Sequence, residues 1–377
     1  MTGDARGPLR PNATIGILGG GQLGRMSAMA AARLGYRTHV FAPEADGPGM
    51  QVATVRTVAA YEDAAALARF AASVAVVTFE FENVPSATLD ALARLVPCRP
   101  GVHLLQVGQD RLREKAFFEQ AGIPVAPWRA VTSREELDAA ILAVGLPAVL
   151  KTTRLGYDGR GQAVLRSPAD ADAAWARLEP RPLILEAFVP FEKEVSAIAA
   201  RGLDGTLHVF DATENRHANH ILDLSLAPAP VPEQVLRRAE ALVARLAVAL
   251  DLVGVLALEL FLLPDGTLLG NEMAPRPHNS GHWTMDACTI GQFEMHVRAI
   301  AGLPLPPPGR FADAVMRNLV GPDSHAVWAE LASHHDVALH LYGKAEARAG
   351  RKMGHATRLL PLRTLAAAAD PASLAPV

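Results

Sequence analysis

Short apolar runs alternate with helical stretches in the first hundred residues. Residues 14–18 and 38–41 are apolar enough to be buried strands, and residues 74–79 form a third candidate. Helical periodicity runs from Gln22 to about Leu34, and Gly35 is a typical helix end. Strands that alternate with helices predict a doubly wound parallel sheet.

The rest of the chain has a mixed pattern. Amphipathic helices are predicted at 110–120 and 232–250, with strands at 146–151, 163–165, 183–186, 194–200 and 207–212. Residues 255–263 and 267–273 flank Pro264-Asp265-Gly266, a strong hairpin signal. After a stiff proline segment at 304–308, strands at 340–343 and 352–359 flank a turn at Ala349-Gly350.

These elements predict a mixed α/β and α+β fold in three units behind a leader at 1–12. The units are a Rossmann-like parallel-sheet domain at 13–109, a central domain at 110–303 and a small β-rich domain at 304–377. A chain of 377 residues is long enough for two or three domains. Its formal charge of −3 gives no electrostatic argument for nucleic acid, and two cysteines cannot form a disulfide framework.

No membrane segment is predicted. The most apolar stretch, 242–263, contains Arg245, Asp251 and Glu259, whereas a spanning helix needs about 20 mostly apolar residues. No long apolar region follows Arg6 and Arg10, which argues against a secretory signal. We therefore expect a soluble cytoplasmic protein without nucleic-acid or membrane partners.

A glycine-rich turn follows the first predicted strand. Gly19, Gly21 and Gly24 fit G-x-G-x-x-G, in which glycines let the backbone approach a phosphate at a helix N-terminus. Glu44 lies about 20 residues on, where a dinucleotide fold has its ribose-binding acid. A nicotinamide cofactor, another phosphorylated ligand and a tight turn without a ligand are all open at this point.

The hairpin carries two opposed glutamates. A two-residue Asp265-Gly266 turn pairs Glu259 with Glu272, whose Cβ atoms would then lie about 4.5–5.5 Å apart. Like charges in that position repel unless a cation compensates, and Mg²⁺ prefers one or two carboxylates plus substrate phosphates. The alternative is two solvated glutamates. We disfavour it because the leucines at 256, 258, 260 and 262 make this segment very apolar. Asn271 adds a further oxygen ligand.

A second glycine-rich segment, 155–162, follows Lys151. Its backbone amides could wrap phosphates, with Lys151 and Arg160 as cations. An ordinary hairpin turn is the alternative, but it needs fewer glycines. The segment is not a P-loop, because no Gly-Lys-Ser/Thr ends it.

Polar residues crowd the chain after the hairpin. Arg276 suits an anion clamp beside a metal site. His278 and His282 have the spacing of a helical zinc pair, but Pro277 and Gly281 argue against a helix there. A basic cluster, Lys344, Arg351 and Lys352, is a solvated surface unless it faces the first glycine turn. No Gly-x-Ser-x-Gly nucleophile motif is present.

Together these features resemble the ATP-grasp carboxylate–amine ligases, and within them the 5-(carboxyamino)imidazole ribonucleotide synthases of purine biosynthesis. The segments that carry the resemblance are 21–26, 78–85, 156–162, 271–276, 278–283 and 350–355. Leu155 stands where family members often have a further glycine. The resemblance implies that ATP phosphorylates bicarbonate to carboxyphosphate. The amine of 5-aminoimidazole ribonucleotide then captures the carboxyl group or the CO₂ released from it, leaving ADP and phosphate.

The resemblance also implies roles for individual residues. Two Mg²⁺ ions, for which Mn²⁺ could substitute, would bind Glu259 and Glu272. Catalytic contributions would come from Lys151, Tyr157, Asp158, Arg276 and His278. The ribonucleotide would meet Gln22, Leu23, Glu80, Lys344, Arg351 and Lys352. ATP would contact Arg111, Lys151, Gly156, Tyr157, Asp158, Gly159, Arg160, Gly161, Gln162, Glu186, Ala187, Phe188, Val189, Glu194, His217, Asn271 and Glu272.

Three rival functions share part of this pattern. A formate-dependent glycinamide ribonucleotide transformylase would share the ATP site but use another carboxylate and amine. A nicotinamide-dependent oxidoreductase would explain the first glycine turn but not the hairpin glutamates. A non-catalytic nucleotide-binding module would bind ATP without hydrolysing it. The family resemblance further implies a homodimer.

Overall fold

The computed structural model describes residues 7–156, 161–178 and 182–376. Its N-terminal part is a parallel sheet, as the alternating pattern predicted, and its strand order is β3-β2-β1-β4. The strands are β1 (Thr14–Leu18), β2 (Arg37–Ala42), β3 (Val55–Val58) and β4 (Val76–Phe79). The helices are α1 (Gln22–Arg33), α2 (Ala64–Ser73), α3 (Ser86–Ala93) and α4 (Val102–Gly108). The β1 end therefore delivers the glycine turn directly to the N-terminus of α1.

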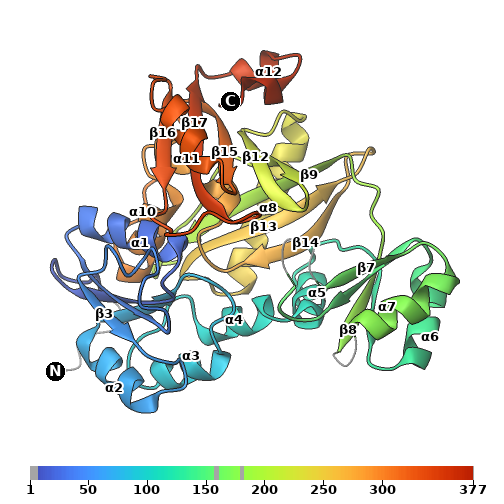
Figure 1. Ribbon diagram of the computed structural model, residues 1–377, viewed down its shortest axis with the longest axis horizontal. Coiled ribbons are helices and arrows are strands. Elements are labelled where there is room, and N and C mark those ends of the chain that lie inside the picture. The colour runs from blue at the N-terminus through green and yellow to red at the C-terminus, as the bar shows by residue number, and fades with distance from the viewer. Residues whose placement is uncertain (1–6, 157–160, 179–181, 377) are drawn as a thin grey trace.

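A small lobe follows α5 (Arg111–Gln120) and projects from the rest of the molecule (Figure 1). It is an antiparallel sheet in the order β5-β8-β6-β7, with two helices packed on it. The strands are β5 (Trp128–Val131), β6 (Ala148–Thr152), β7 (Gln162–Leu165) and β8 (Leu183–Ala187); the helices are α6 (Arg134–Val144) and α7 (Ala171–Leu178). Its own apolar cluster makes the lobe a separately packed unit.

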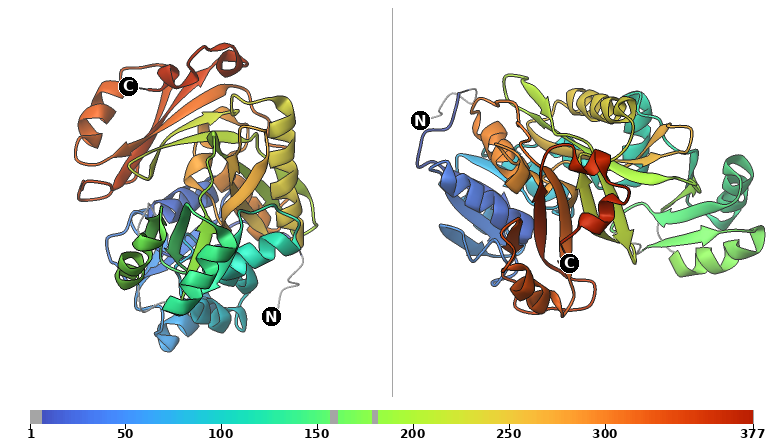
Figure 2. Two further views of the ribbon diagram at one scale, coloured as in Figure 1. Left: turned by 90° about the vertical axis from the view of Figure 1, so that its right-hand side faces the viewer. Right: turned by 90° about the horizontal axis from the view of Figure 1, so that it is seen from above.

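The largest sheet runs β14-β13-β9-β11-β12-β15-β17-β16, with β10 beside β9. From the middle of the chain come β9 (Lys193–Arg201), β10 (Leu207–Val209), β11 (Thr213–Ala218), β12 (Ile221–Ala227), β13 (Gly254–Leu262) and β14 (Leu268–Ala274). The C-terminal part adds β15 (Asp313–Val320), β16 (Val337–Leu341) and β17 (Lys352–Leu360). The sequence analysis missed β11, β12 and β15 of this sheet, and also β3 and β5 of the two smaller sheets. Since β15 pairs with β12, the C-terminal strands extend the central sheet (Figure 2).

The remaining helices cover this sheet and its edges. They are α8 (Glu233–Ala249), α9 (Thr284–Ala287), α10 (Gln292–Ala301), α11 (Ser324–Leu331) and α12 (Thr364–Ala367). Helix α10 also packs against α1, which fastens the central sheet to the N-terminal domain. The predicted domain boundaries at 109/110 and 303/304 stay predictions.

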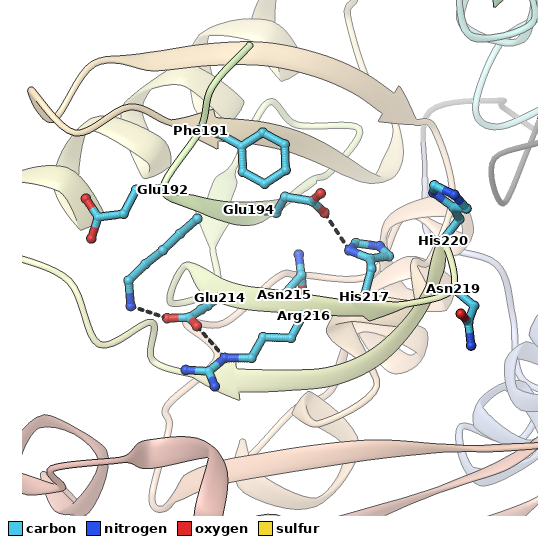
Figure 3. A pocket seen from close by; sticks show the side chains of 10 residues that line it. Phe191, Glu192, Glu194, Glu214, Asn215, Arg216, His217, Asn219 and His220 are labelled. Carbon is cyan, nitrogen blue, oxygen red and sulfur yellow. Dashed lines mark hydrogen bonds and ion pairs between the residues drawn. The ribbon is translucent and has the colours of Figure 1, made fainter. Parts of the chain in front are cut away.

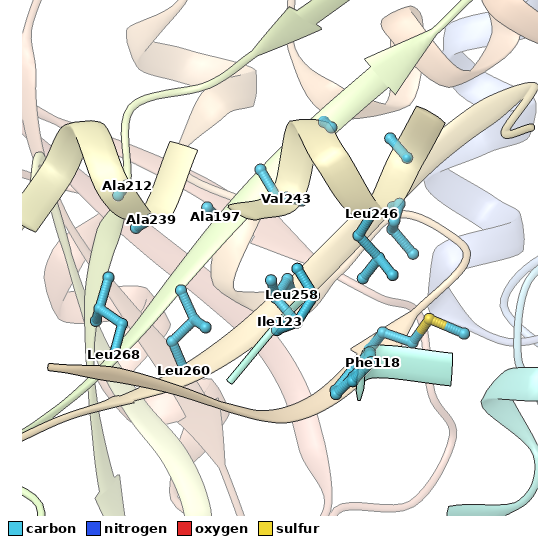
Figure 4. Close-up of a cluster of buried hydrophobic side chains, with 14 of the residues drawn as sticks. Phe118, Ile123, Ala197, Ala212, Ala239, Val243, Leu246, Leu258, Leu260 and Leu268 are labelled. Carbon is cyan, nitrogen blue, oxygen red and sulfur yellow. The ribbon is translucent and has the colours of Figure 1, made fainter. Parts of the chain in front are cut away.

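The main core lies between α8 and the central sheet (Figure 4). Two alanines, Ala197 on β9 and Ala212 immediately before β11, face Ala239 and Val243 of α8, so that helix and sheet approach closely. The leucine face predicted for β13 is buried here at 256, 258, 260 and 262. Among the described residues, none of the helices combines the length and the hydropathy needed to cross a bilayer.

Candidate active site

The first glycine turn encloses a carboxylate of the protein itself. Glu80, directly after β4, accepts hydrogen bonds from the backbone amides of Gly21 (2.5 Å) and Gly24 (2.9 Å). Burial raises the pKa of Glu80 although these amides favour its ionised form. Since Glu80 fills the anion site at the α1 N-terminus, a dinucleotide pyrophosphate cannot sit there as it does in a Rossmann enzyme. Gln22 and Leu23 occupy the first turn beside it.

The C-terminal basic cluster faces this turn. Gln51 of the N-terminal domain donates to the carbonyl of Gly343 (2.7 Å), immediately before Lys344. Lys344 donates to the carbonyl of Lys352 (2.6 Å), and Arg351 lies next to it in sequence. Burial lowers the pKa of Lys344 to about 8, with the charge of Arg351 acting in the same direction and that of Glu80 against it. The basic cluster therefore faces the first glycine turn, which is the arrangement expected of an anion pocket.

Glu259 and Glu272 are paired directly across β13 and β14, as predicted. The predicted two-residue turn is wrong, because Leu263 pairs with Thr267 around three residues. A β-bulge corrects the register: Leu260 pairs with Gly270 while Glu259 pairs with Glu272, leaving Asn271 extra. In a regular strand Asn271 and Glu272 would point to opposite faces, and the bulge relaxes that constraint.

Each hairpin glutamate has a basic side chain as its neighbour. Glu259 lies 3.0 Å from Nε2 of His278, and Glu272 lies 3.2 Å from Arg111. Burial disfavours the charge of Glu259, but the His278 hydrogen bond and charge outweigh it and lower the pKa of Glu259. Two carboxylates in register, with an amide oxygen beside them, form a donor set of hard oxygens that suits Mg²⁺.

Arg276 connects the hairpin to the N-terminal domain. Its guanidinium is paired with Glu82, two residues after Glu80, and donates to the carbonyl of Pro277 (3.1 Å). Burial disfavours ionisation of Glu82, yet the charge and hydrogen bond of Arg276 lower the pKa of Glu82 to about 2. The pair is therefore ionic over the whole working range of an enzyme.

The zinc interpretation of His278 and His282 is wrong for the described geometry. His278 uses Nε2 on Glu259 and Nδ1 on Ser280, whereas His282 is fully buried with Nδ1 on Gln292. Pro277 and Gly281 place the two rings on a loop and a short 3₁₀ turn, Asn279–Gly281, so that they do not converge.

Lys151 lies at the end of β6 and is paired with Glu186 (3.2 Å). Burial disfavours the charge of Glu186, but Lys115 and Lys151 outweigh it and lower the pKa of Glu186 to about 2. The amides of the next two residues already donate to the protein, from Ala187 to Pro127 and from Phe188 to Pro147. Val189 follows them in the segment that leads to β9.

A cavity of about 720 Å³ is lined by residues of β9 and β11 and by the segments next to them (Figure 3). Its lining includes Glu194 and His217, which point toward each other with 2.5 Å between carboxylate oxygen and Nδ1. Burial opposes protonation of His217, but the Glu194 hydrogen bond and charge raise the pKa of His217. Lys193 and Glu214 also line the cavity and are paired with each other (2.6 Å). Phe191 also lines the cavity and stacks on Phe261.

A smaller cavity of about 80 Å³ lies between the hairpin and the glycine-rich segment. It is lined by Glu82, Asn83, Gly108, Gln109, Arg111, Glu114, Thr153, Arg154, Leu155, Gly156, Glu272 and Met273. Arg111 also donates to the carbonyl of Gly156 (3.3 Å). Predicted ATP ligands and the residues around Arg276 thus meet in one place.

Part of the glycine-rich segment lies outside the described residues, namely Tyr157, Asp158, Gly159 and Arg160. Its described ends are held: the carbonyl of Gly161 accepts from Thr152 (2.9 Å), and Gln162 begins β7. Leu155 has φ +61° and is exposed. A glycine would be free of strain at such a φ.

The sequence analysis missed three supports of this site: the partly exposed Glu82 and the buried Glu114 and Lys115. Glu114 accepts from the amide of Met273 (2.7 Å), and Lys115 is paired with Glu186 (3.3 Å). The rarity of lysine in this chain could have pointed to Lys115. The chain has only five lysines among 36 Lys and Arg residues, and the other four were singled out or line the large cavity.

Comparisons with known proteins agree with this geometry. Three family models match: a ribonucleotide synthetase preATP-grasp domain (12–109), an ATP-grasp domain (116–293) and a phosphoribosylaminoimidazole carboxylase C-terminal domain (314–367). The chain is 53% identical to an N5-carboxyaminoimidazole ribonucleotide synthase of Brucella melitensis, over 94% of this chain and 98% of that protein.

Solved structures are similar over nearly the whole chain. The ADP complex of an N5-carboxyaminoimidazole ribonucleotide synthetase is 46% identical, with a TM-score of 0.90 over 95% of this chain and 94% of that one. The Aspergillus clavatus synthase with ADP and 5-aminoimidazole ribonucleotide is 31% identical, with a TM-score of 0.86 over 93% and 94%. The three-part fold class expected from the sequence is confirmed.

Proposed function

The chain belongs to the N5-carboxyaminoimidazole ribonucleotide synthase family of ATP-grasp ligases, and on this premise we propose how its residues divide the reaction. It is a ligase that uses ATP and bicarbonate to carboxylate the amine of 5-aminoimidazole ribonucleotide in purine biosynthesis. The product is 5-(carboxyamino)imidazole ribonucleotide. Carboxyphosphate as the intermediate is part of the proposal.

The contact of Arg276 with Glu82 carries the assignment of roles. Arg276 follows the hairpin glutamate Glu272 by four residues, and Glu82 follows Glu80 of the glycine turn by two. One guanidinium therefore stands between an ATP-side carboxylate pair and a ribonucleotide-side glycine turn. An acyl phosphate made on one side and an amine held on the other would react beside it. Fixed positive charge at that point stabilises the developing negative charge.

ATP would bind between the small lobe and the central sheet. Its phosphates would bind Lys151, near the end of β6, and Arg111, at the start of α5. The segment Gly156–Gln162 would close over them. The cavity with Glu194 and His217 suits the ribose hydroxyls, since a carboxylate accepts from both. Adenine would be read by the backbone of residues 186–189. Because the amides of Ala187 and Phe188 and the carbonyl of Val189 already bond within the protein, we assign the amide of Val189 to that contact.

Two Mg²⁺ ions would be held by Glu259 and Glu272, with Asn271 close by, and would supply charge neutralisation to the triphosphate. Mn²⁺ is an alternative ion. The protein's own part is to hold both carboxylates in register, which the bulge and the contacts with His278 and Arg111 support.

The ribonucleotide would lie between the glycine turn and the C-terminal cluster. Lys344, Arg351 and Lys352 would meet its phosphate. The amides of Gln22 and Leu23, together with Glu80, would meet the sugar and base. His278, held by Glu259 and Ser280, is the titratable group that could take the amine proton near Arg276. Tyr157 and Asp158 belong to the closing segment in this proposal.

A homodimer and a cytoplasmic location complete the proposal, supported by the family resemblance. Sedimentation equilibrium at micromolar concentration would show twice the 40.0 kDa chain mass if the dimer exists. A monomer that is fully active would contradict it.

The first experiment is ADP release from Mg-ATP and bicarbonate, with and without 5-aminoimidazole ribonucleotide. Strong stimulation by the ribonucleotide, dependent on bicarbonate, is expected. If the folded protein binds ATP but is stimulated by formate and glycinamide ribonucleotide instead, the transformylase assignment replaces this one. If ATP binds and no co-substrate stimulates turnover, the non-catalytic alternative stands.

A further inference from the structure

Side chains on one face of helix α5 contact four consecutive residues of β14, 270–273. Arg111, Glu114 and Lys115 stand at positions i, i+3 and i+4, which lie on the same side of a helix. Lys115 donates to the carbonyls of Gly270 (3.1 Å) and Asn271 (2.8 Å). Arg111 pairs with the next residue, Glu272, and Glu114 accepts from the amide after it. These contacts span the β-bulge that contains Asn271 and precedes Glu272.

The ammonium group of Lys115 has no donor left for a ligand. A lysine has three N–H donors, and here they meet two carbonyl oxygens and a carboxylate oxygen of Glu186 (3.3 Å). Its side chain is 1% exposed. Lys115 therefore acts on the reaction through its partners and does not touch the nucleotide.

Those partners belong to two different parts of the site. Glu186 uses its second oxygen to hold Lys151 (3.2 Å), which, like Glu186, lies in the sheet of the small lobe. The two carbonyls belong to the central sheet, beside the proposed metal ligand Glu272. A continuous polar chain thus runs from the bulge through Lys115 and Glu186 to Lys151.

The choice of lysine is itself informative in this chain. Arginine supplies nearly all of its 36 basic residues, yet lysine stands at this buried position. A compact ammonium can meet three convergent acceptors, whereas the planar guanidinium fork cannot. The geometry of the three acceptors explains the residue type.

We infer that Lys115 is a positioning residue that sets Lys151 and the Asn271–Glu272 bulge in one fixed arrangement, so that phosphate-binding and metal-binding groups are placed together. The inference rests on the proposed roles of Lys151 and Glu272. Losing such a support is expected to weaken metal-nucleotide binding about 10–100-fold, as loss of other outer-sphere partners of metal sites does.

The test compares Lys115→Met with Arg113→Met, which removes an exposed cation from the same helix. Calorimetric titration with ADP and Mg²⁺ should show at least tenfold weaker binding for Lys115→Met and unchanged binding for Arg113→Met. Steady-state assays should show a higher Mg²⁺ requirement and a higher KM for ATP, with KM for the ribonucleotide unchanged. Folded Lys115→Met with wild-type Mg-ADP affinity would overturn the inference.

Two further variants separate positioning from folding. Lys115→Arg keeps the charge but cannot meet the three acceptors, so its Tm should fall less than that of Lys115→Met while Mg-ADP affinity remains low. The double variant Lys115→Met/Glu186→Gln also removes the buried carboxylate that has lost one of its two lysine partners, so its Tm should recover in part but its affinity should not. Recovery of both Tm and affinity in either variant would show that Lys115 only stabilises the fold.

Lys151→Met and Glu272→Gln serve as reference variants. If both lose Mg-ADP affinity while the Lys115 variants keep it, the inference alone fails. If the reference variants themselves bind Mg-ADP normally, the proposed roles of Lys151 and Glu272 fail first, and the inference fails with them.

Discussion

The negative charge of Glu272 is the residue-scale feature on which the proposed metal site depends. Glu272→Gln keeps the shape of the side chain but removes the charge that would balance Mg²⁺. We expect turnover to fall by about a hundredfold or more. ADP release in the full reaction measures it. Glu330→Gln, an exposed glutamate on α11, is the matched control. Near-normal turnover of folded Glu272→Gln would refute the metal role.

The lowered pKa of Lys344 predicts that kcat/KM for the ribonucleotide depends on pH. Its pKa of about 8 lies below the ordinary 10.5, so the ammonium is charged below pH 8 and neutral above it. If it binds the substrate phosphate, kcat/KM for the ribonucleotide should fall up to tenfold per pH unit above pH 8. Lys344→Ala should raise KM for the ribonucleotide at pH 7, and Lys344→Arg should remove the alkaline fall. An effect confined to KM for ATP would contradict the assignment.

At the scale of elements, the approach of β14 to α5 depends on a glycine. A Cβ at Gly270 would lie 3.0 Å from side-chain atoms of both Ile123 and Phe118, which are buried and cannot easily move. Gly270→Ala should therefore cost about 1–3 kcal/mol of unfolding free energy. Urea denaturation measures the change. Gly7→Ala, where a Cβ meets nothing within 4 Å, should lie close to wild type. Equal stability of the two variants would disprove the close packing.

At the scale of the whole molecule, the Arg276–Glu82 pair joins two domains. Glu82→Gln leaves a buried guanidinium without its carboxylate and should cost about 1–3 kcal/mol. The folded pKa of Glu82, about 2, lies below its ordinary 4.5. The stabilisation is therefore full above pH 4.5 and is lost as the pH falls toward 2.

Chemical unfolding at several pH values measures this dependence. The difference in unfolding free energy between wild type and Glu82→Gln should be constant from pH 7 to about 5 and shrink below that. Glu62→Gln, an exposed N-terminal carboxylate, is the control. A difference that grows on acidification would show that the pair is not ionic in the folded protein.

The element-scale predictions from sequence succeeded where the pattern is local. Residues 14–18 and the helix after them have a clear local pattern. The opposed glutamates of the hairpin were found by counting outward from its turn. The turn length was wrong, and only the bulge at Asn271 restored the predicted pairing. A bulge is set by how two strands and α5 pack, and no residue of the hairpin alone announces it.

The amino-acid sequence by itself determined the chemistry of this protein: the parallel N-terminal sheet, the glycine turns, the carboxylate pair and the basic cluster. These are properties of residue type and spacing along one segment. Only the tertiary structure decided which groups meet. It brought Glu80 into the glycine turn, Glu82 to Arg276, and Lys115 to Glu186 and the bulge. Such contacts join residues tens to almost two hundred positions apart, and their free energy depends on burial and geometry that no local pattern contains.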